Sequence, residues 1–225
     1  GLVGAAPIQN IGAYGAEGAE CISVVEAWDR HAGRTVRLDR ADCDFGYRDS
    51  VFKRVPDRWI VTAVELRLSR KGTPRLGYAG VREELEAMGA AAATALQVAE
   101  AVRRLRRRKL PDPAVIGNAG SFFKNPVVPA EVAGRLRDEH GDLPVYPAGA
   151  GLGKLSAAWL IERCGWRGIR EGDAGIAAQH ALVLVNHGRA SGTELLALAH
   201  RVARSVEERF GVRLEPEPRI VGANW

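Results

Sequence analysis

Cysteine is scarce in this chain, and the placement of the few cysteines excludes two kinds of scaffold. Cys21, Cys43 and Cys164 are far apart and form no C-x-x-C pair. Disulfide-stapled small domains use an even number of cysteines, and structural zinc sites use closely spaced cysteines or histidines. The sequence therefore predicts neither, and it favours a reducing compartment. We expect the chain to be cytoplasmic.

Long apolar runs are also missing. No segment is long enough to cross a bilayer, and no signal-peptide pattern opens the chain, so we expect no membrane span. There is no internal repeat and no low-complexity tract. The first residue is Gly1 rather than methionine, and the opening segment resembles the interior of a protein. We therefore expect the chain to be part of a longer one.

Several catalytic signatures are absent. Ser121 does not stand in a G-x-S-x-G elbow, so a Ser-His-Asp hydrolase is excluded. The histidines show no metal spacing such as H-E-x-x-H. The glycines of residues 1–20 do not form G-x-G-x-x-G after a strand, so a Rossmann fold is not favoured. Closely spaced glycines beside apolar residues instead suit a backbone that lies against a flat or phosphorylated ligand.

The composition is that of a globular protein that binds an anion. The 225 residues are 46% apolar and 26% charged, which is enough to build one large domain or two modest ones around a core. The net charge of +5 fits either a phosphorylated small molecule or nucleic acid. A basic run at residues 103–108 ends a predicted helix, where arginines complement the helix dipole. It has no aromatic residues between its arginines, so we expect no nucleic-acid binding.

Periodicity predicts a mixture of helices and strands. The predicted strands are a hairpin over residues 22–38, a strand over 59–68 and a buried strand over 181–186; the predicted helices cover 81–107 with an interruption at Gly89, 129–140, 155–164 and 191–210. Ser191 and Glu194 form a capping-box pattern, and Gly211 is placed to end the last helix. The prolines of residues 110–113 mark the best domain boundary.

The richest stretch for chemistry is residues 117–126. It combines Ser121, Asn125, a lysine and two phenylalanines, with glycines ahead of the serine. It predicts a tight loop that presents Ser121 and Asn125 above an apolar floor formed by Phe122 and Phe123. A hairpin turn with a buried aromatic pair explains the pattern equally well.

Three charged residues have both a binding and a structural explanation. Arg48 lies between apolar residues, so it either forks onto a carboxylate or phosphate or pairs with Asp49, and the ion pair is favoured. Lys154 ends a glycine-rich loop just before a predicted helix, so it holds a phosphate or is simply exposed. Glu217, between two prolines, presents a carboxylate or belongs to an edge strand.

Five stretches together resemble the UDP-N-acetylenolpyruvylglucosamine reductases, also called UDP-N-acetylmuramate dehydrogenases or MurB. They are Val3–Gly15, Phe45–Ser50, Lys109–Pro113, Gly117–Val128 and Leu214–Glu217, in the order of the family. The resemblance implies a flavoenzyme of peptidoglycan synthesis, in which NADPH reduces FAD and the flavin passes a hydride to the enolpyruvyl group of a UDP-linked sugar. It implies no metal, no nucleic acid and a monomer.

The resemblance also implies a role for each site residue. Ser121 would protonate the carbanion, and Arg48 and Glu217 would stabilise the enolate-like intermediate. The residues implied to hold the UDP-sugar are Tyr47, Tyr78, Lys109, Asn125, Tyr146 and Lys154. The residues implied to line the flavin are Ala5, Ile8, Gly12, Ala13 and Val61. In the family the position of His180 lies near the nucleotide.

The fold implied by the resemblance is α+β. Residues 1–110 would be the second subdomain of a two-subdomain FAD-binding fold of the vanillyl-alcohol-oxidase type, residues 111–219 an α+β substrate domain, and residues 220–225 a tail. The chain would enter after the first FAD subdomain. The alternative function is a non-catalytic UDP-sugar or nucleotide-binding module that has lost the flavin half. A nucleic-acid binder that uses residues 103–108 is a weaker alternative.

Overall fold

The architecture is α+β, as predicted, with helices and antiparallel sheets along the whole computed structural model. The structure describes residues 2–90 and 93–225. The chain divides into two compact units, Gly1–Leu105 and Arg106–Trp225. That the first part of the chain serves the flavin and the second the substrate stays a prediction. No helix in the described parts of the chain is long and apolar enough to cross a membrane.

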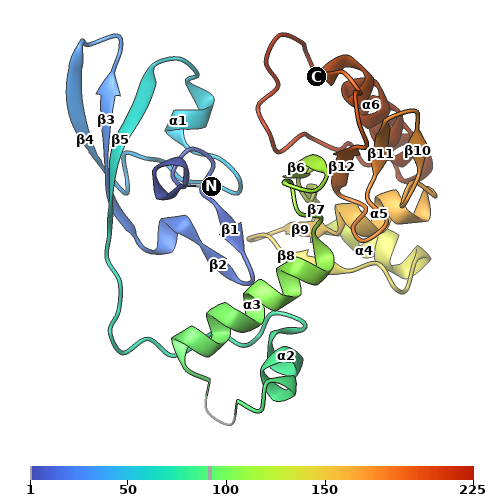
Figure 1. Ribbon diagram of the computed structural model, residues 1–225, viewed down its shortest axis with the longest axis horizontal. Helices are drawn as coiled ribbons and strands as arrows, with labels where there is room; N and C mark the ends of the chain where they lie inside the picture. Colours follow the sequence, from blue (N-terminus) through green and yellow to red (C-terminus); the bar gives the residue numbers. More distant parts are fainter. Residues whose placement is uncertain (1, 91–92) are drawn as a thin grey trace. The chain divides into compact units, whose positions relative to one another are not determined.

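The first unit contains an antiparallel sheet with the strand order β4-β3-β5 (Figure 1). Its strands are β3 (Ile22–Asp29), β4 (Arg34–Asp39) and β5 (Trp59–Leu66), which confirms the predicted hairpin and the strand after it. Asp29 fixes the end of β3, because its carboxylate accepts the main-chain N–H groups of the turn and forms an ion pair with Arg58 at 2.7 Å. This hydrogen bond to Arg58 lowers the pKa of Asp29 to about 2.

The opening segment of the first unit has more regular structure than its sequence predicts. Its elements are η1 (Val3–Ala5), β1 (Gly12–Ala13), β2 (Ala16–Glu17) and η2 (Gly18–Glu20). A buried amide holds them in place, because Asn10 donates to Glu17 and to the Gly46 carbonyl and accepts the Ala19 N–H at 2.8 Å. Such tertiary hydrogen bonds leave no periodic pattern of apolar residues in the sequence, so periodicity does not predict these elements.

The helical segment predicted over residues 81–107, with its interruption at Gly89, forms two helices. They are α2 (Val81–Ala87) and α3 (Ala95–Lys109). Gly89 has a φ of 67°, a conformation that ends a helix at little cost only for glycine. The interruption predicted at Gly89 is therefore confirmed. Residues 91 and 92, inside the predicted segment, lie outside the described residues, as does Gly1.

The second unit contains two small antiparallel sheets and three helices. The first sheet has the order β10-β11-β12-β6, formed by Arg170–Glu171, Ala174–Ile176, Val183–Asn186 and Gly117–Ser121. The second has the order β7-β9-β8, formed by Val127–Pro129, Leu152–Leu155 and Val145–Pro147. The helices are α4 (Ala130–Glu139), α5 (Ala157–Arg163) and α6 (Gly192–Phe210). The first unit also contains the short helix α1 (Val51–Arg54).

Two predictions about this unit are wrong. Residues 117–121 are a strand rather than a tight loop, because β12 offers them a ladder of hydrogen bonds. Lys154 lies within strand β9 rather than just before a helix, and α5 begins at Ala157, after the N-cap Ser156. The prediction for α6 is confirmed, with the capping box of Ser191 and Glu194 and with Gly211 at a φ of 66°.

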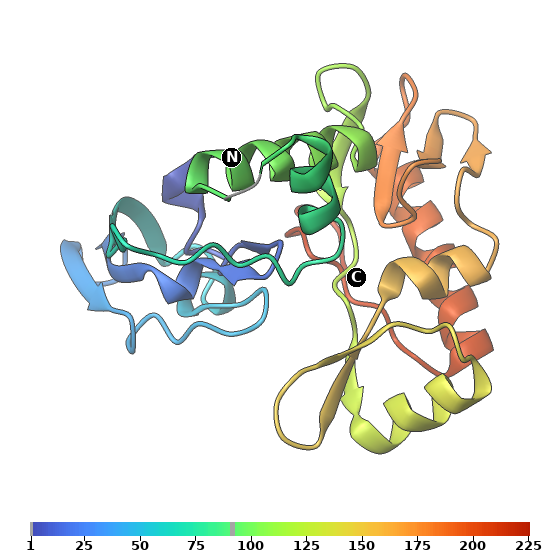
Figure 2. The same cartoon turned by 90° about the horizontal axis from the view of Figure 1, so that it is seen from below.

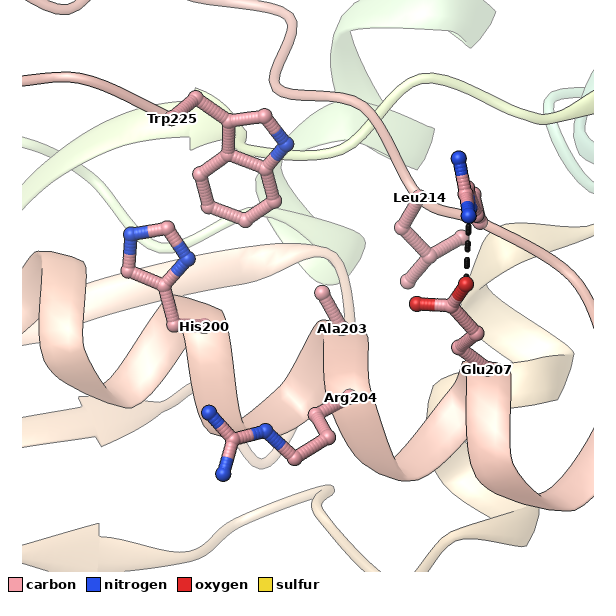
Figure 3. A pocket seen from close by; sticks show the side chains of 7 residues that line it. His200, Ala203, Arg204, Glu207, Leu214 and Trp225 are labelled. Atoms are coloured by element: carbon pink, nitrogen blue, oxygen red, sulfur yellow. Dashed lines mark hydrogen bonds and ion pairs between the residues drawn. The ribbon is translucent and has the colours of Figure 1, made fainter.

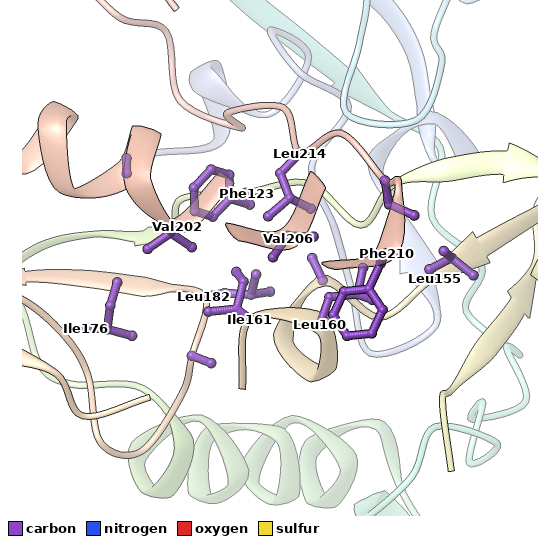
Figure 4. Packing of buried hydrophobic residues seen from close by; sticks show 14 of the residues in the cluster. Phe123, Leu155, Leu160, Ile161, Ile176, Leu182, Val202, Val206, Phe210 and Leu214 are labelled. Atoms are coloured by element: carbon purple, nitrogen blue, oxygen red, sulfur yellow. The ribbon is translucent and has the colours of Figure 1, made fainter. Parts of the chain in front are cut away.

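One hydrophobic core holds the second unit together (Figure 4). Helices α5 and α6 pack against each other (Figure 2), and α6 also covers β11 and β12. Phe123 is buried in this core, only 1% exposed, with Val202 and Val206 of α6 in the same cluster. The residue two positions after Ser121 is therefore anchored in the core, which fixes the end of β6.

Candidate functional site

Ser121 is held at the end of a strand. It lies directly opposite Val183 of β12, and the next residue, Phe122, donates its N–H to the Leu182 carbonyl at 2.7 Å. The serine is half-buried. Because the strand is fixed on both sides of it, the position of its hydroxyl is set by the backbone rather than by a mobile loop, which is what an acid-base group requires.

Glu217 lies beside this strand end. Its N–H donates to the Phe122 carbonyl at 2.7 Å, and Pro216 forms an antiparallel bridge with Phe123. The N–H of Lys124 in turn donates to the Glu215 carbonyl at 2.9 Å. The segment at residues 215–217 therefore runs antiparallel to the residues that follow Ser121. The structure brings together the two predicted catalytic residues of this unit, and Glu217 has the edge-strand character that was the alternative explanation of its prolines.

Tyr146 and Lys154, two of the residues predicted to hold the UDP-sugar, are cross-strand partners. They lie directly opposite each other on β8 and β9, so their side chains lie on the same face of the sheet. Tyr146 is 46% exposed and Lys154 is half-buried. A lysine ammonium beside a phenol hydroxyl offers several hydrogen-bond donors to phosphate oxygens. The register of this sheet therefore builds a donor pair that the sequence pattern alone does not predict.

Asn125 connects the Ser121 segment to helix α5. Its Oδ1 accepts the N–H of Ala157, the first residue of α5, at 3.0 Å. The Ser156 hydroxyl accepts the Trp159 N–H of the same helix at 3.3 Å. Two of the N–H groups that a helix start leaves unpaired are thus satisfied by side chains. Asn125 therefore has a structural role in addition to the predicted contact with substrate.

Lys109, at the end of α3, lies within electrostatic reach of His180. Burial is the largest cause of a lowered pKa for the His180 imidazole, followed by the positive charges of Lys109 and Arg167. His180 Nδ1 accepts the Leu182 N–H at 3.2 Å, so the neutral ring carries its proton on Nε2 and can donate from there. Since Leu182 also binds Phe122, Lys109 and His180 belong to the surroundings of the same strand end.

In the first unit, the structure brings together Arg48 and Gly12. An Arg48 Nη2 hydrogen bond to the Gly12 carbonyl is 2.5 Å long, and a Cβ on Gly12 would come within 2.8 Å of Arg48 Nη1. A side chain at position 12 would therefore require the Arg48 guanidinium to move. Arg48 has a φ of 56°, an uncommon conformation for a non-glycine residue that is found at functional sites. The Asp49 carboxylate, which the sequence favours as the ion-pair partner of Arg48, forms an ion pair with Arg54.

The aromatic residues predicted to touch substrate in the first unit each have a ring or cation neighbour. The Arg48 guanidinium lies 5.2 Å from the centre of the Tyr47 ring, a cation–π distance. Tyr78 is exposed, and its ring centre lies 4.8 Å from that of Tyr14.

The predicted flavin-lining residues present a small apolar surface. Ile8 and Val61 both pack against the hydrophobic cluster beneath the β3–β5 sheet, and the Ser50 hydroxyl fixes Ile8 by donating to its carbonyl at 2.6 Å. Ala5 and Ala13 are exposed. Exposed alanines beside half-exposed Ile8 and Val61 fit a flat, largely apolar ring, so these residues fit the group that the resemblance implies.

Metal ligation has no support in the described ranges, 2–90 and 93–225. No group of three or more histidine, cysteine, aspartate or glutamate side chains there could hold a metal ion. The two buried or half-buried thiols, Cys43 and Cys164, have raised pKa values because of burial, so they are poor nucleophiles.

Comparison with known proteins gives the family. Residues 112–221 match the family model for the C-terminal domain of UDP-N-acetylenolpyruvoylglucosamine reductase. The reductase of Xanthomonas euvesicatoria is 62% identical over 226 residues, which include all of this chain and 65% of that protein. The chain belongs to the UDP-N-acetylenolpyruvoylglucosamine reductase family.

Other members of the reductase family agree with this assignment. The reductase of Xylella fastidiosa is 58% identical over the whole of this chain and 64% of its own length. The crystal structure of the Thermus caldophilus reductase has a TM-score of 0.60 and 27% identity, and the match covers 96% of this chain and 59% of that one. The chain therefore spans about two thirds or less of the length of these reductases, 65% for the first of them.

Some features near the Ser121 strand were missed by sequence reasoning. Lys124 forms an ion pair with Glu215 at 3.1 Å, which reinforces the pairing of the two segments. Trp225 contacts both phenylalanines of the predicted floor. No period or motif marks either contact, because both join residues far apart in the sequence.

Proposed function

We propose that this chain carries the residues with which a reductase acts on UDP-N-acetylenolpyruvoylglucosamine in peptidoglycan precursor synthesis. The reaction would use FAD, with NADPH as the hydride donor, and would give UDP-N-acetylmuramate. The observation that supports this most is the main-chain hydrogen bond from Glu217 to Phe122, because it brings the main chain of Glu217 beside the strand end that carries Ser121. Membership of the reductase family supplies the substrate class.

The bound flavin would supply the hydride, which adds to the β-carbon of the enolpyruvyl group. Ser121 would donate its hydroxyl proton to the neighbouring α-carbon. A serine hydroxyl is a weak acid, so the step requires groups that stabilise the developing charge. Glu217 in the second unit and Arg48 in the first would provide hydrogen bonds and charge for this purpose. Ala5, Ile8, Gly12, Ala13 and Val61 would hold the flavin ring.

The second unit would bind the nucleotide part of the substrate. Lys154 and Tyr146 share one face of the β8–β9 pair and would contact the diphosphate, with Lys109 and Asn125 as further donors. Tyr47 and Tyr78 of the first unit would contact the sugar end. On this proposal residues 1–110 serve the flavin and residues 111–219 the substrate, and the protein acts as a cytoplasmic monomer.

Calorimetric titration of UDP-N-acetylenolpyruvoylglucosamine into the chain tests the binding part. Lys154→Ala should weaken binding by about tenfold or more, because one charge-assisted hydrogen bond contributes roughly 1.5–3 kcal/mol. Lys71→Ala is the matched control, since this exposed lysine of the first unit has no place in the site. Equal affinities of both variants and the unaltered chain would reject the placement of the diphosphate.

Turnover separates the reductase from a module that only binds UDP-sugars. In the protein supplied with FAD and NADPH, Ser121→Ala should reduce kcat by about 10²- to 10⁴-fold and leave substrate affinity nearly unchanged. Ser69→Ala, an exposed serine of the first unit, is the control. Substrate binding without any turnover in the unaltered protein would favour the binding module, and unchanged turnover in Ser121→Ala would remove Ser121 as the acid.

A further inference from the structure

Four aromatic rings meet where the chain ends. The Trp225 ring is stacked on His200 of α6, with centres 4.5 Å apart and an interplanar angle of 13°. The same indole lies 6.0 Å from the Phe122 ring and 5.8 Å from the Phe123 ring. Phe122 and Phe123 themselves contact edge to face at 5.0 Å. Trp225 therefore joins helix α6 to the two residues that follow Ser121.

The indole does not fill a closed core. It borders a shallow hollow of about 280 Å³ that is also lined by Ala203 and Leu214 (Figure 3). An ion pair between Glu207 and Arg213, 2.7 Å long, lies at the same hollow. Trp225 is 40% exposed. A large ring that is ordered against three others and still half in solvent contributes little to the core, so its contacts call for another explanation than burial.

Phe122 contacts the Trp225 ring and also forms main-chain hydrogen bonds with two other segments. Its N–H donates to the carbonyl of Leu182, the residue before β12, and its carbonyl accepts from Glu217, both at 2.7 Å. A main-chain unit that is bonded on both sides moves only if one of the two bonds opens. The Phe122 ring is half-buried and not enclosed by the core in the way that Phe123 is. The indole is thus a lateral support for the ring of Phe122, whose main chain bonds to both Leu182 and Glu217.

We infer that Trp225 is a positioning residue for the Ser121–Glu217 pair. By holding the Phe122 ring against α6 through His200, it keeps both hydrogen bonds of Phe122 closed and so fixes the spacing between the hydroxyl and the carboxylate. The effect on catalysis rests on the proposed function. The effect on the two hydrogen bonds does not, and it is measured separately.

Amide hydrogen exchange measures the two hydrogen bonds directly. In Trp225→Ala the Glu217 and Phe122 amides should exchange roughly three- to tenfold faster, since the loss of aromatic contacts raises the opening equilibrium by about that factor. The Val206 amide, within α6, should be unchanged and so shows that the unit stays folded. Trp28→Ala is the matched control, because Trp28 is 41% exposed and lies in the first unit. Trp225→Phe should restore slow exchange.

Steady-state kinetics then tests the consequence. Trp225→Ala should lower kcat several-fold with little change in KM, and Trp225→Phe should recover it, as a positioning role requires. Unchanged exchange at Glu217 and Phe122 in Trp225→Ala would overturn the inference, as would a Trp225→Phe variant that exchanges as fast as Trp225→Ala. Faster exchange in a protein that shows no reductase turnover even when unaltered would keep the support by Trp225 and reject the proposed function alone.

Discussion

Asn125 offers a way to separate stability from binding at a single residue. Its Oδ1 accepts the N–H of Ala157, a residue that is 0% exposed, so Asn125→Ala would leave a buried donor without that partner. An unsatisfied buried donor costs roughly 1–3 kcal/mol. In Asn125→Asp an acceptor oxygen stays in place, and a carboxylate near a helix start is favourable. We therefore expect Asn125→Ala to lower the free energy of unfolding by about 1–3 kcal/mol and Asn125→Asp to lower it by less than about 0.5 kcal/mol.

Urea unfolding followed by tryptophan fluorescence measures both losses, since Trp159 of α5 lies on the helix that Asn125 holds. Thermal unfolding gives a second readout, in which each kcal/mol corresponds to a shift of roughly 2–4 °C for a chain of this size. If the side-chain amide also donates to substrate, Asn125→Asp should bind weakly while remaining stable. The reasoning fails if Asn125→Ala unfolds at the same urea concentration as the unaltered chain, or if Asn125→Asp is equally destabilised.

Three further changes follow from contacts and pKa values. Gly153→Ala should lower the free energy of unfolding measured in urea by about 1–3 kcal/mol, because its Cβ would meet a methyl group of α4 at 2.6 Å. Gly134→Ala, inside α4, meets open space and should raise that free energy by roughly 0.5–1 kcal/mol. Because the pKa of His180 is lowered, the folded chain binds a proton there less readily than the unfolded chain, so the free energy of unfolding should fall as the pH drops below about 6.5. His180→Gln should make this fall shallower, and an equal pH dependence in the two proteins would exclude His180 as its cause. Asp29, with a pKa of about 2, contributes stability that is present above about pH 3.8 and is lost as the pH falls toward 2. Arg58→Gln should raise the titration midpoint of Asp29 measured by NMR, and an unchanged midpoint would exclude Arg58 as the cause of the lowered pKa.

Local signals were sufficient to predict much of the fold. Helix α6 has a capping box at one end and Gly211 at the other, and the β3–β4 hairpin has a clear turn between Asp29 and Arg34, so their bounds follow from neighbouring residues. The strand at Ser121 could not be predicted in this way, because its partner β12 lies far away in the sequence. For the same reason Lys154 was placed before a helix, when its pairing with β7 and β8 makes it part of a sheet.

In the candidate site too, local motifs predict some features, whereas contacts between residues distant in sequence could not be predicted. A resemblance in short motifs identified Ser121, Glu217 and Arg48, and the structure shows that Ser121 and Glu217 lie on paired segments. It could not show that the absent side chain of Gly12 gives room to Arg48, since this depends on a contact between residues distant in sequence. It also could not predict the support of Phe122 by Trp225, for which no motif exists.

The pairing of the Ser121 strand with the segment at residues 215–217 has a consequence for synthesis of the chain on the ribosome. Ser121 emerges early, whereas its neighbour Glu217 emerges only near the end, after both sheets and all three helices of the second unit have been made. Contacts of such long sequence separation close late in folding. A nascent chain interrupted before residue 215 would therefore contain every other element of the unit and still lack Glu217. Any reactivity that needs the proposed Ser121–Glu217 pair would be confined to chains that have been completed through this segment.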